Sequence, residues 1–144
     1  MADVSKTATD IRPLPQYVSR RFDAGGSIYA GDAVYIAADG DVERADADGS
    51  LTAQAIGVMV ADNDGGTLAV SGDRVDVVVF GPVTGYSSLT PGLLVFASVT
   101  AGGMTQDAPA NGTYVVPVGI AYDASTIMVN PVWSASEDPY VAKS

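Results

Sequence analysis

The stretch Ala30-Gly31-Asp32-Ala33-Val34-Tyr35-Ile36 has a counterpart later in the chain, Thr90-Pro91-Gly92-Leu93-Leu94-Val95-Phe96. Each stretch is a glycine-containing turn followed by a short apolar strand. A second apolar stretch follows each one, Ile56-Gly57-Val58 in the first copy and Val118-Gly119-Ile120 in the second. Gly31 and Gly57 are 26 positions apart, and Gly92 and Gly119 are 27 apart. The spacing predicts an internally duplicated β unit, with generic β-turn patterning as the alternative explanation.

Short runs of β-branched and aromatic residues continue on both sides of these copies. Turn signals such as Asp64-Gly65-Gly66 and Asn111-Gly112 separate the runs, and no helical periodicity extends beyond about two turns. Many short strands at this spacing predict an all-β domain, either a compact β-barrel or a sandwich. The Gly81-Pro82 pair is expected to end the strand over Val75–Phe80, and a further strand is expected over Val83–Tyr86.

The chain divides into three segments by composition. Residues 1–26 hold four basic and three acidic residues, whereas the remaining 118 hold three basic and fourteen acidic ones. We expect residues 1–26 to form an extended N-terminal arm, residues 27–132 to form the β-barrel or sandwich domain, and residues 133–144 to form a C-terminal tail.

The N-terminal segment is unusually apolar for a solvated tail. Pro13 and Pro15 hold the chain extended, and Gln16–Phe22 has the alternating character of a strand. One interpretation is a frayed terminus, and the other is an arm that orders against another subunit. The second interpretation makes these residues an interface: Ile11, Leu14, Tyr17, Val18, Arg20, Arg21 and Phe22.

The composition restricts the possible chemistry. The chain has no histidine and no cysteine, so catalytic sites that use imidazole or thiolate are excluded, and a metal could be held only by oxygen ligands. A Ser-Lys dyad would require Lys6 or Lys143, the only lysines, which lie near the two ends. We therefore expect no enzymatic activity, no catalytic residues, no cofactor and no metal.

Two aspartate-rich stretches resemble the start of a calcium-binding loop, Asp46-Ala47-Asp48-Gly49 and Asp62-Asn63-Asp64-Gly65. A bidentate glutamate is required about six positions after the glycine, and Ala55 and Ser71 stand there instead. Tight turns explain both stretches better. Asp39, Asp41 and Glu43 could in principle act as a glycosidase pair, but no aromatic platform surrounds them, and a solvated hairpin face is the better interpretation.

Trp133 is the sole tryptophan, and it follows the last predicted strand, Ile127–Val129. It can cap the core, or it can anchor a subunit interface, where tryptophan is favoured. The net charge of −10 argues against nucleic-acid binding. No apolar run is long enough to span a bilayer, and the N-terminal sequence lacks the pattern of a secretory signal, so we expect the chain to be made and used in the cytoplasm, or assembled there into something larger.

Together these motifs resemble the small capsid decoration (cement) proteins of tailed bacteriophages. The resemblance covers roughly residues 24–131 and rests on short β-turn motifs. They are Ala30-Gly31-Asp32-Ala33-Val34, Asp39-Gly40-Asp41-Val42, Ala55-Ile56-Gly57-Val58, the alternating valines within Asp73–Gly81, and Val118-Gly119-Ile120-Ala121.

The resemblance implies a homotrimer that binds the major capsid protein on the outside of the phage head and stabilises the virion. It also implies that the N-terminal arm reaches a neighbouring subunit, since an extended segment can add a strand to a sheet edge. Residues after Trp133 depart from the family pattern. A phage tail or fibre module, or a carbohydrate-binding β domain, is the alternative function, and a small polysaccharide hydrolase using Asp39, Asp41 and Glu43 is a more distant one.

Overall fold

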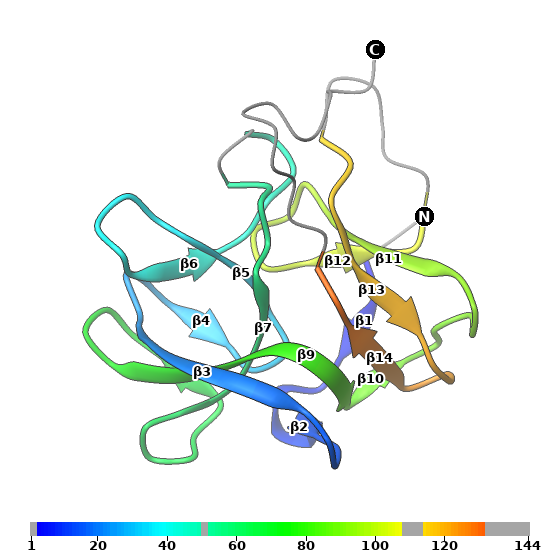
Figure 1. The fold of residues 1–144 in the computed structure, drawn as a ribbon, viewed down its shortest axis with the longest axis horizontal. Helices are drawn as coiled ribbons and strands as arrows, with labels where there is room; N and C mark the ends of the chain where they lie inside the picture. Colours follow the sequence, from blue (N-terminus) through cyan, green and yellow to red (C-terminus); the bar gives the residue numbers. More distant parts are fainter. Residues whose placement is uncertain (1–2, 50–51, 108–113, 132–144) are drawn as a thin grey trace.

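The computed structural model describes residues 3–49, 52–107 and 114–131, and all its elements but one are β-strands (Figure 1). The exception is a single turn of 3-10 helix, η1 (Ala8–Asp10). The strands are β1 (Ser5–Lys6), β2 (Arg12–Pro13), β3 (Val18–Asp23), β4 (Ile28–Tyr29), β5 (Ala33–Ile36), β6 (Val42–Arg44), β7 (Gly57–Asp62), β8 (Leu68–Ala69), β9 (Arg74–Thr84), β10 (Tyr86–Ser87), β11 (Leu94–Ala97), β12 (Met104–Thr105), β13 (Pro117–Ala121) and β14 (Thr126–Val129).

One antiparallel sheet of ten strands forms the body of the protein and curls into a half-barrel. Its order is β12-β11-β13-β14-β9-β7-β5-β6, and β2 and β3 also pair with β9. Two short pairs, β1 with β10 and β4 with β8, lie outside it. The expectation of an all-β fold is confirmed.

The long strand β9 runs from beside β3 and β7 to beside β14 and so links the two parts of the sheet (Figure 1). Its first part pairs with β3 and β7, and its last part pairs with β2 and β14. The strand break expected at Gly81-Pro82 is wrong. Gly81 adopts a φ of +120°, which lets the strand bend without ending, and the carbonyl of Pro82 accepts a hydrogen bond from the Leu14 amide at 2.9 Å.

The internal duplication is present in the register of the sheet. In the first copy Ala33 faces Val58 and Val34 faces Gly57, and in the second copy Leu94 faces Ile120 and Val95 faces Gly119. The hairpins also correspond, because Tyr35 pairs with Glu43 where Phe96 pairs with Thr105. Each copy then pairs with a fourth strand at the same level, Val58 with Val78 and Ile120 with Met128. We call the two four-stranded units, β6-β5-β7-β9 and β12-β11-β13-β14, the first half and the second half.

Equivalent glycines hold equivalent places in both halves. Gly31 and Gly92 have φ angles of +92° and +87°, and their amides donate to the carbonyls of Met59 and Ala121 at 2.7 and 2.9 Å. A Cβ at Gly57 would lie 2.2 Å from the Val78 carbonyl oxygen, and one at Gly119 would lie 2.1 Å from that of Met128. The second strand of each half therefore approaches its neighbour so closely that only glycine fits.

The N-terminal segment is extended, as predicted, but it lies along its own chain. β1 pairs with β10, while β2 and β3 pair with β9. Ile11 is buried in the core, which also contains residues of both halves. Ala24 of this segment belongs to the same core, and Val4, Ala8 and Phe22 pack against it.

An ion pair between a partly buried lysine and a buried aspartate fixes the start of this segment. The Lys6 ammonium contacts Asp32 Oδ1, and Asp32 Oδ2 accepts a hydrogen bond from the Tyr29 amide at 2.8 Å. Burial raises the pKa of the Asp32 carboxyl, and the nearby Lys6 charge opposes that effect. Beside it the buried Tyr86 hydroxyl donates to the Gly31 carbonyl at 3.0 Å, and burial raises the pKa of that phenol. The second copy has Leu93 where the first has Asp32, so this anchor belongs to the first half alone.

We predict that Gly57→Ala and Gly119→Ala each destabilise the fold by about 2–3 kcal/mol, because a new Cβ must push two strands apart. Urea unfolding measures the decrease in the free energy of unfolding. Gly26→Ala is the control, because its Cβ would meet only a Glu43 side-chain oxygen at 3.8 Å. Equal stability of all three variants would contradict the close approach of the strands.

We predict that Lys6→Met destabilises the protein by about 2–4 kcal/mol at neutral pH, because Asp32 remains buried without its counter-charge. Removal of Lys6 raises the folded-state pKa of Asp32 further. The deficit relative to the wild type is therefore full above that raised pKa, and it shrinks as the pH falls through it and Asp32 takes up a proton.

The matched control is Arg74→Met, which removes the same charge from the exposed pair that Arg74 Nε forms with Asp23 Oδ1 at 3.4 Å. This change should cost less than about 1 kcal/mol. Urea unfolding at a series of pH values compares the two variants, and a pH-independent deficit in Lys6→Met would count against the buried pair.

Candidate functional site: an exposed edge strand

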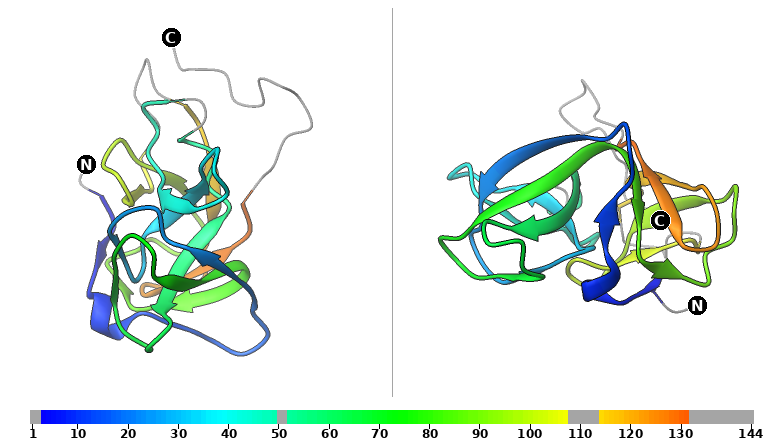
Figure 2. Two further views of the ribbon diagram at one scale, coloured as in Figure 1. Left: turned by 90° about the vertical axis from the view of Figure 1, so that its left-hand side faces the viewer. Right: turned by 90° about the horizontal axis from the view of Figure 1, so that it is seen from below.

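The strand β3 lies at the outside of the molecule, beside β9 (Figure 2). One of its edges pairs with β9 from Val18 opposite Phe80 to Asp23 opposite Arg74. Within the described ranges no strand pairs with its other edge. The backbone groups along an unpaired edge can accept a further strand.

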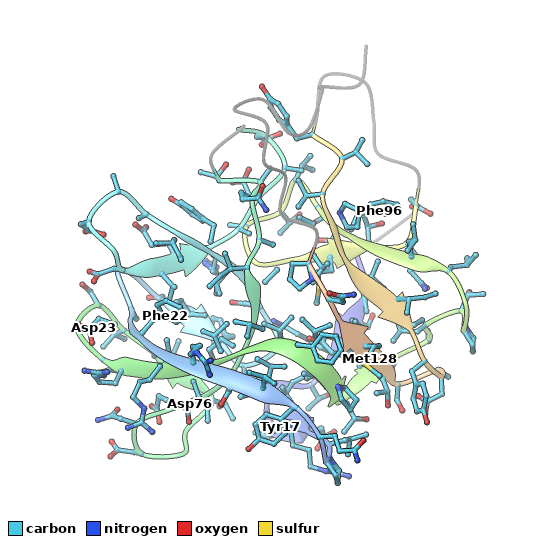
Figure 3. The ribbon with its side chains drawn as sticks, viewed as in Figure 1. Tyr17, Phe22, Asp23, Asp76, Phe96 and Met128 are labelled. Atoms are coloured by element: carbon cyan, nitrogen blue, oxygen red, sulfur yellow. The ribbon has the colours of Figure 1, made fainter. Side chains whose placement is uncertain are left out.

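Apolar and basic side chains occur together along this edge. Tyr17 and Val18 are 44% and 41% exposed, and Phe80, opposite Val18 on β9, is 48% exposed. Arg20 and Arg21 follow on the same strand and are also exposed. We call these five residues the β3 edge site; Figure 3 labels Tyr17 within it.

The two arginines differ in their contacts. Arg21 Nε lies 3.0 Å from Asp76 Oδ1 on β9, so its charge is partly compensated. The Arg20 guanidinium donates to the Ser19 carbonyl at 2.9 Å, and among the described residues it forms no ion pair with a carboxylate. A tyrosine and an arginine that stay exposed are the side chains most often found at the centre of protein interfaces. Because the rest of the chain is strongly acidic, a basic edge also orients an approaching partner.

The structure divides the interface residues that the sequence predicted. Tyr17, Val18, Arg20 and Arg21 lie together at the β3 edge site. Ile11 is only 7% exposed, so it serves the core, and Phe22 is half-buried against that core. Leu14 is half-buried and lines a depression next to β9. Trp133 lies outside the described residues.

The sequence did not indicate Phe80 as part of the site. Phe80 follows Val77-Val78-Val79, where the alternation of apolar and polar residues ends, and the pairing with Val18 shows that Phe80 lies beside the β3 edge. The valine run itself has both faces buried at Val77 and Val78. Alternation along one strand therefore could not assign Phe80 to the outside.

The aspartate-rich stretches form turns, as predicted. Asp46 Oδ1 accepts a hydrogen bond from the Asp48 amide at 2.9 Å, and Asp62 Oδ1 accepts one from the Asp64 amide at 2.9 Å. Asp39 Oδ1 similarly accepts from the Asp41 amide at 3.0 Å. Each carboxylate thus caps its own backbone. In the part of the chain that the structure describes, no three acidic residues come together as a metal site would require.

No helix among the described residues has the length and apolar character needed to cross a membrane. In comparisons with known proteins, no family model matches the chain, and no curated protein sequence matches it.

Proposed function

We propose that this chain is a structural virion protein that binds the outer surface of a phage capsid as a homotrimer and stabilises the head. The observation that carries the proposal is the β3 edge site, where an unpaired strand edge presents Tyr17, Val18, Arg20 and Arg21 together. The partner is the major capsid protein. An extended segment of that protein, or of a neighbouring decoration subunit, adds a strand beside β3.

The charge distribution is consistent with this role. Two of the four basic residues of the N-terminal segment, Arg20 and Arg21, lie on the contact edge, while the residues after position 26 include fourteen acidic and three basic ones. An acidic outer surface keeps decorated particles apart in solution. The arginines on the edge favour a contact that contains carboxylates.

Stabilisation of a shell follows from multivalency and mass action. A trimer offers three copies of the same edge, and the second and third contacts form at a high effective concentration. A protein that binds the assembled shell more tightly than free subunits shifts the equilibrium toward the shell. A modest affinity of each β3 edge for the capsid is therefore sufficient for the trimer to stabilise the shell.

A carbohydrate-binding domain is the main alternative, and the exposed aromatic residues are its best support. Tyr122 is 65% exposed and lines a depression together with Phe80 and Met128. Of the described residues that line the depression, Gln16 alone carries an amide, carboxylate or charged group. Sugar sites need several convergent polar groups, so the capsid-binding role is better supported.

We predict that the wild-type protein binds bare expanded capsids and raises their disassembly temperature, and that the double variant Tyr17→Ser/Arg20→Glu binds about tenfold more weakly. Neither residue belongs to the core or forms an ion pair within the described part of the chain, so the variant should fold normally. Cosedimentation with capsids measures binding, and thermal disassembly measures stabilisation.

The matched control is Arg44→Glu, which reverses an exposed charge on β6, an end strand of the sheet that does not pair with β3. It should bind like the wild type. Failure of the wild-type protein to bind capsids would reject the proposed function, whereas equal binding by both variants would reject β3 as the contact. Sedimentation of the free protein should give the mass of three 14.6 kDa chains.

A further inference from the structure

A lysine amine and an aspartate carboxyl group meet inside the fold, away from the β3 edge site. The Lys6 side chain extends from β1, and its Nζ contacts Asp32 Oδ1. Asp32 is 5% exposed, and the Lys6 side chain is 23% exposed. A lysine amine is a nucleophile when it is uncharged, and an amine can condense with a carboxylic acid to form an amide. The pair is therefore a candidate for a covalent bond as well as for an ion pair.

Two glycines leave the space in which this pair meets. A Cβ at Gly31 would lie 2.7 Å from Lys6 Cδ, and a Cβ at Gly102 would lie 2.7 Å from Asp32 Cγ. The lysine stem therefore lies against one backbone turn, and the carboxyl group lies against another. The amine and the carboxyl group are held between the two turns, which restricts the orientations that each can adopt.

A backbone amide and a phenol complete the surroundings of the carboxyl group. The Tyr29 amide donates a hydrogen bond to Asp32 Oδ2 at 2.8 Å. A donor in this position stabilises the negative charge that develops on Oδ2 when an amine adds to Cγ. Tyr86 lies directly opposite Lys6 in the pairing of β1 with β10 and is 4% exposed. The buried phenol thus occupies space beside the pair that water would otherwise fill.

Burial favours the uncharged forms of both groups. A charged pair that leaves water loses its hydration, and transfer of one proton from Lys6 to Asp32 leaves a neutral amine and a neutral acid. Burial raises the pKa of the Asp32 carboxyl in spite of the nearby Lys6 charge, so this transfer becomes easier. The neutral amine and the neutral acid are the forms that can react with each other.

We propose that Lys6 and Asp32 form a modification site, at which the folded chain makes an isopeptide bond between Lys6 Nζ and Asp32 Cγ. One proton first passes from Nζ to Oδ1. The lone pair of Nζ then attacks Cγ, and the Tyr29 amide stabilises the negative Oδ2. A second proton passes from Nζ to the Oδ1 hydroxyl, the bond between Cγ and Oδ1 breaks, and one water molecule leaves. The reaction needs no oxidant, reductant or activated co-substrate.

The fixed contact between the two groups supplies the driving force. A free amine and a free carboxylic acid hardly condense in water, because hydration stabilises the separate ions. Groups that are held together in a reactive orientation behave as if each were present at an effective molarity of up to roughly 10⁵–10⁸ M. Lys6 is the more exposed partner, so the water that is released has a short path to solvent.

The bond closes a covalent loop from residue 6 to residue 32. This loop contains β2 and β3, so both ends of the segment that pairs with β9 become fixed to the same domain. Closing a loop lowers the conformational entropy of the unfolded chain and so favours the folded one. The proposal goes beyond the capsid-binding role and does not depend on it.

The mass of the intact chain tests the proposal. The purified wild-type protein, denatured and measured by mass spectrometry, should be lighter than its sequence by one water molecule, about 18 Da. Trypsin should not cleave after Lys6. The peptide that ends at Arg20 should instead be recovered joined to the peptide of residues 22–44, which contains Asp32.

Lys6→Arg is the variant that removes the chemistry and keeps the charge. Arginine retains a cation beside Asp32 but stays protonated, so it cannot act as the nucleophile. Its mass should equal that of its sequence. Lys143→Arg is the matched control, because it makes the same substitution at the only other lysine and should retain the loss of water. Far-UV circular dichroism should show both variants folded.

A wild-type mass equal to that of the sequence would overturn the proposal. A loss of water that persists in Lys6→Arg would overturn it equally, because an Asp-Gly turn such as Asp64-Gly65 can lose water by closing to a succinimide. Either result leaves the capsid-binding proposal intact, since that role is tested by cosedimentation with capsids.

Discussion

Sharing of one strand is the constraint on which the rest of this structure depends. β9 supplies the fourth strand of the first half and then continues beside β14, so it joins the two halves into one sheet. The same strand holds the N-terminal segment through β2 and β3. Its valines at 75, 77, 78 and 83 are all buried, which places the centre of the core along this strand. A substitution that moves β9 therefore acts on both halves and on the β3 edge site at once.

The two halves share backbone geometry but not side-chain chemistry. Gly57 and Gly119 permit the same close approach, and the turn glycines Gly31 and Gly92 adopt the same left-handed conformation. These positions are restricted by backbone sterics, which no neighbouring side chain can relieve. Asp32 and Leu93 occupy equivalent positions without that restriction, and there one copy forms a buried ion pair while the other exposes a leucine. The duplication is thus strict where the backbone requires it and relaxed elsewhere.

This difference explains how much could be predicted from the sequence. The duplicated unit and the all-β class were predictable, because glycine spacing and β-branched runs report on backbone conformation. The continuity of β9 was not, since Gly81-Pro82 normally ends a strand, and here the glycine's positive φ and an accepting proline carbonyl keep it in place. The partner of Lys6 was also hidden, because a lysine near a terminus is usually solvated. Its contact with Asp32 arises only when β1 pairs with β10.

The candidate site was likewise predictable only in part from the sequence. The sequence indicated an apolar and basic segment at Tyr17–Arg21, but which side chains face outward depends on the register with β9. That register buries Phe22 against the core and leaves Tyr17 and Val18 exposed. Equivalent positions of the two halves show a related effect, because identical register buries Val58 in the first half, where the N-terminal segment lies, and leaves Ile120 exposed in the second. The surfaces of this fold that remain free to bind are therefore decided by the chain segments that pack over the repeats. The repeats themselves decide this less.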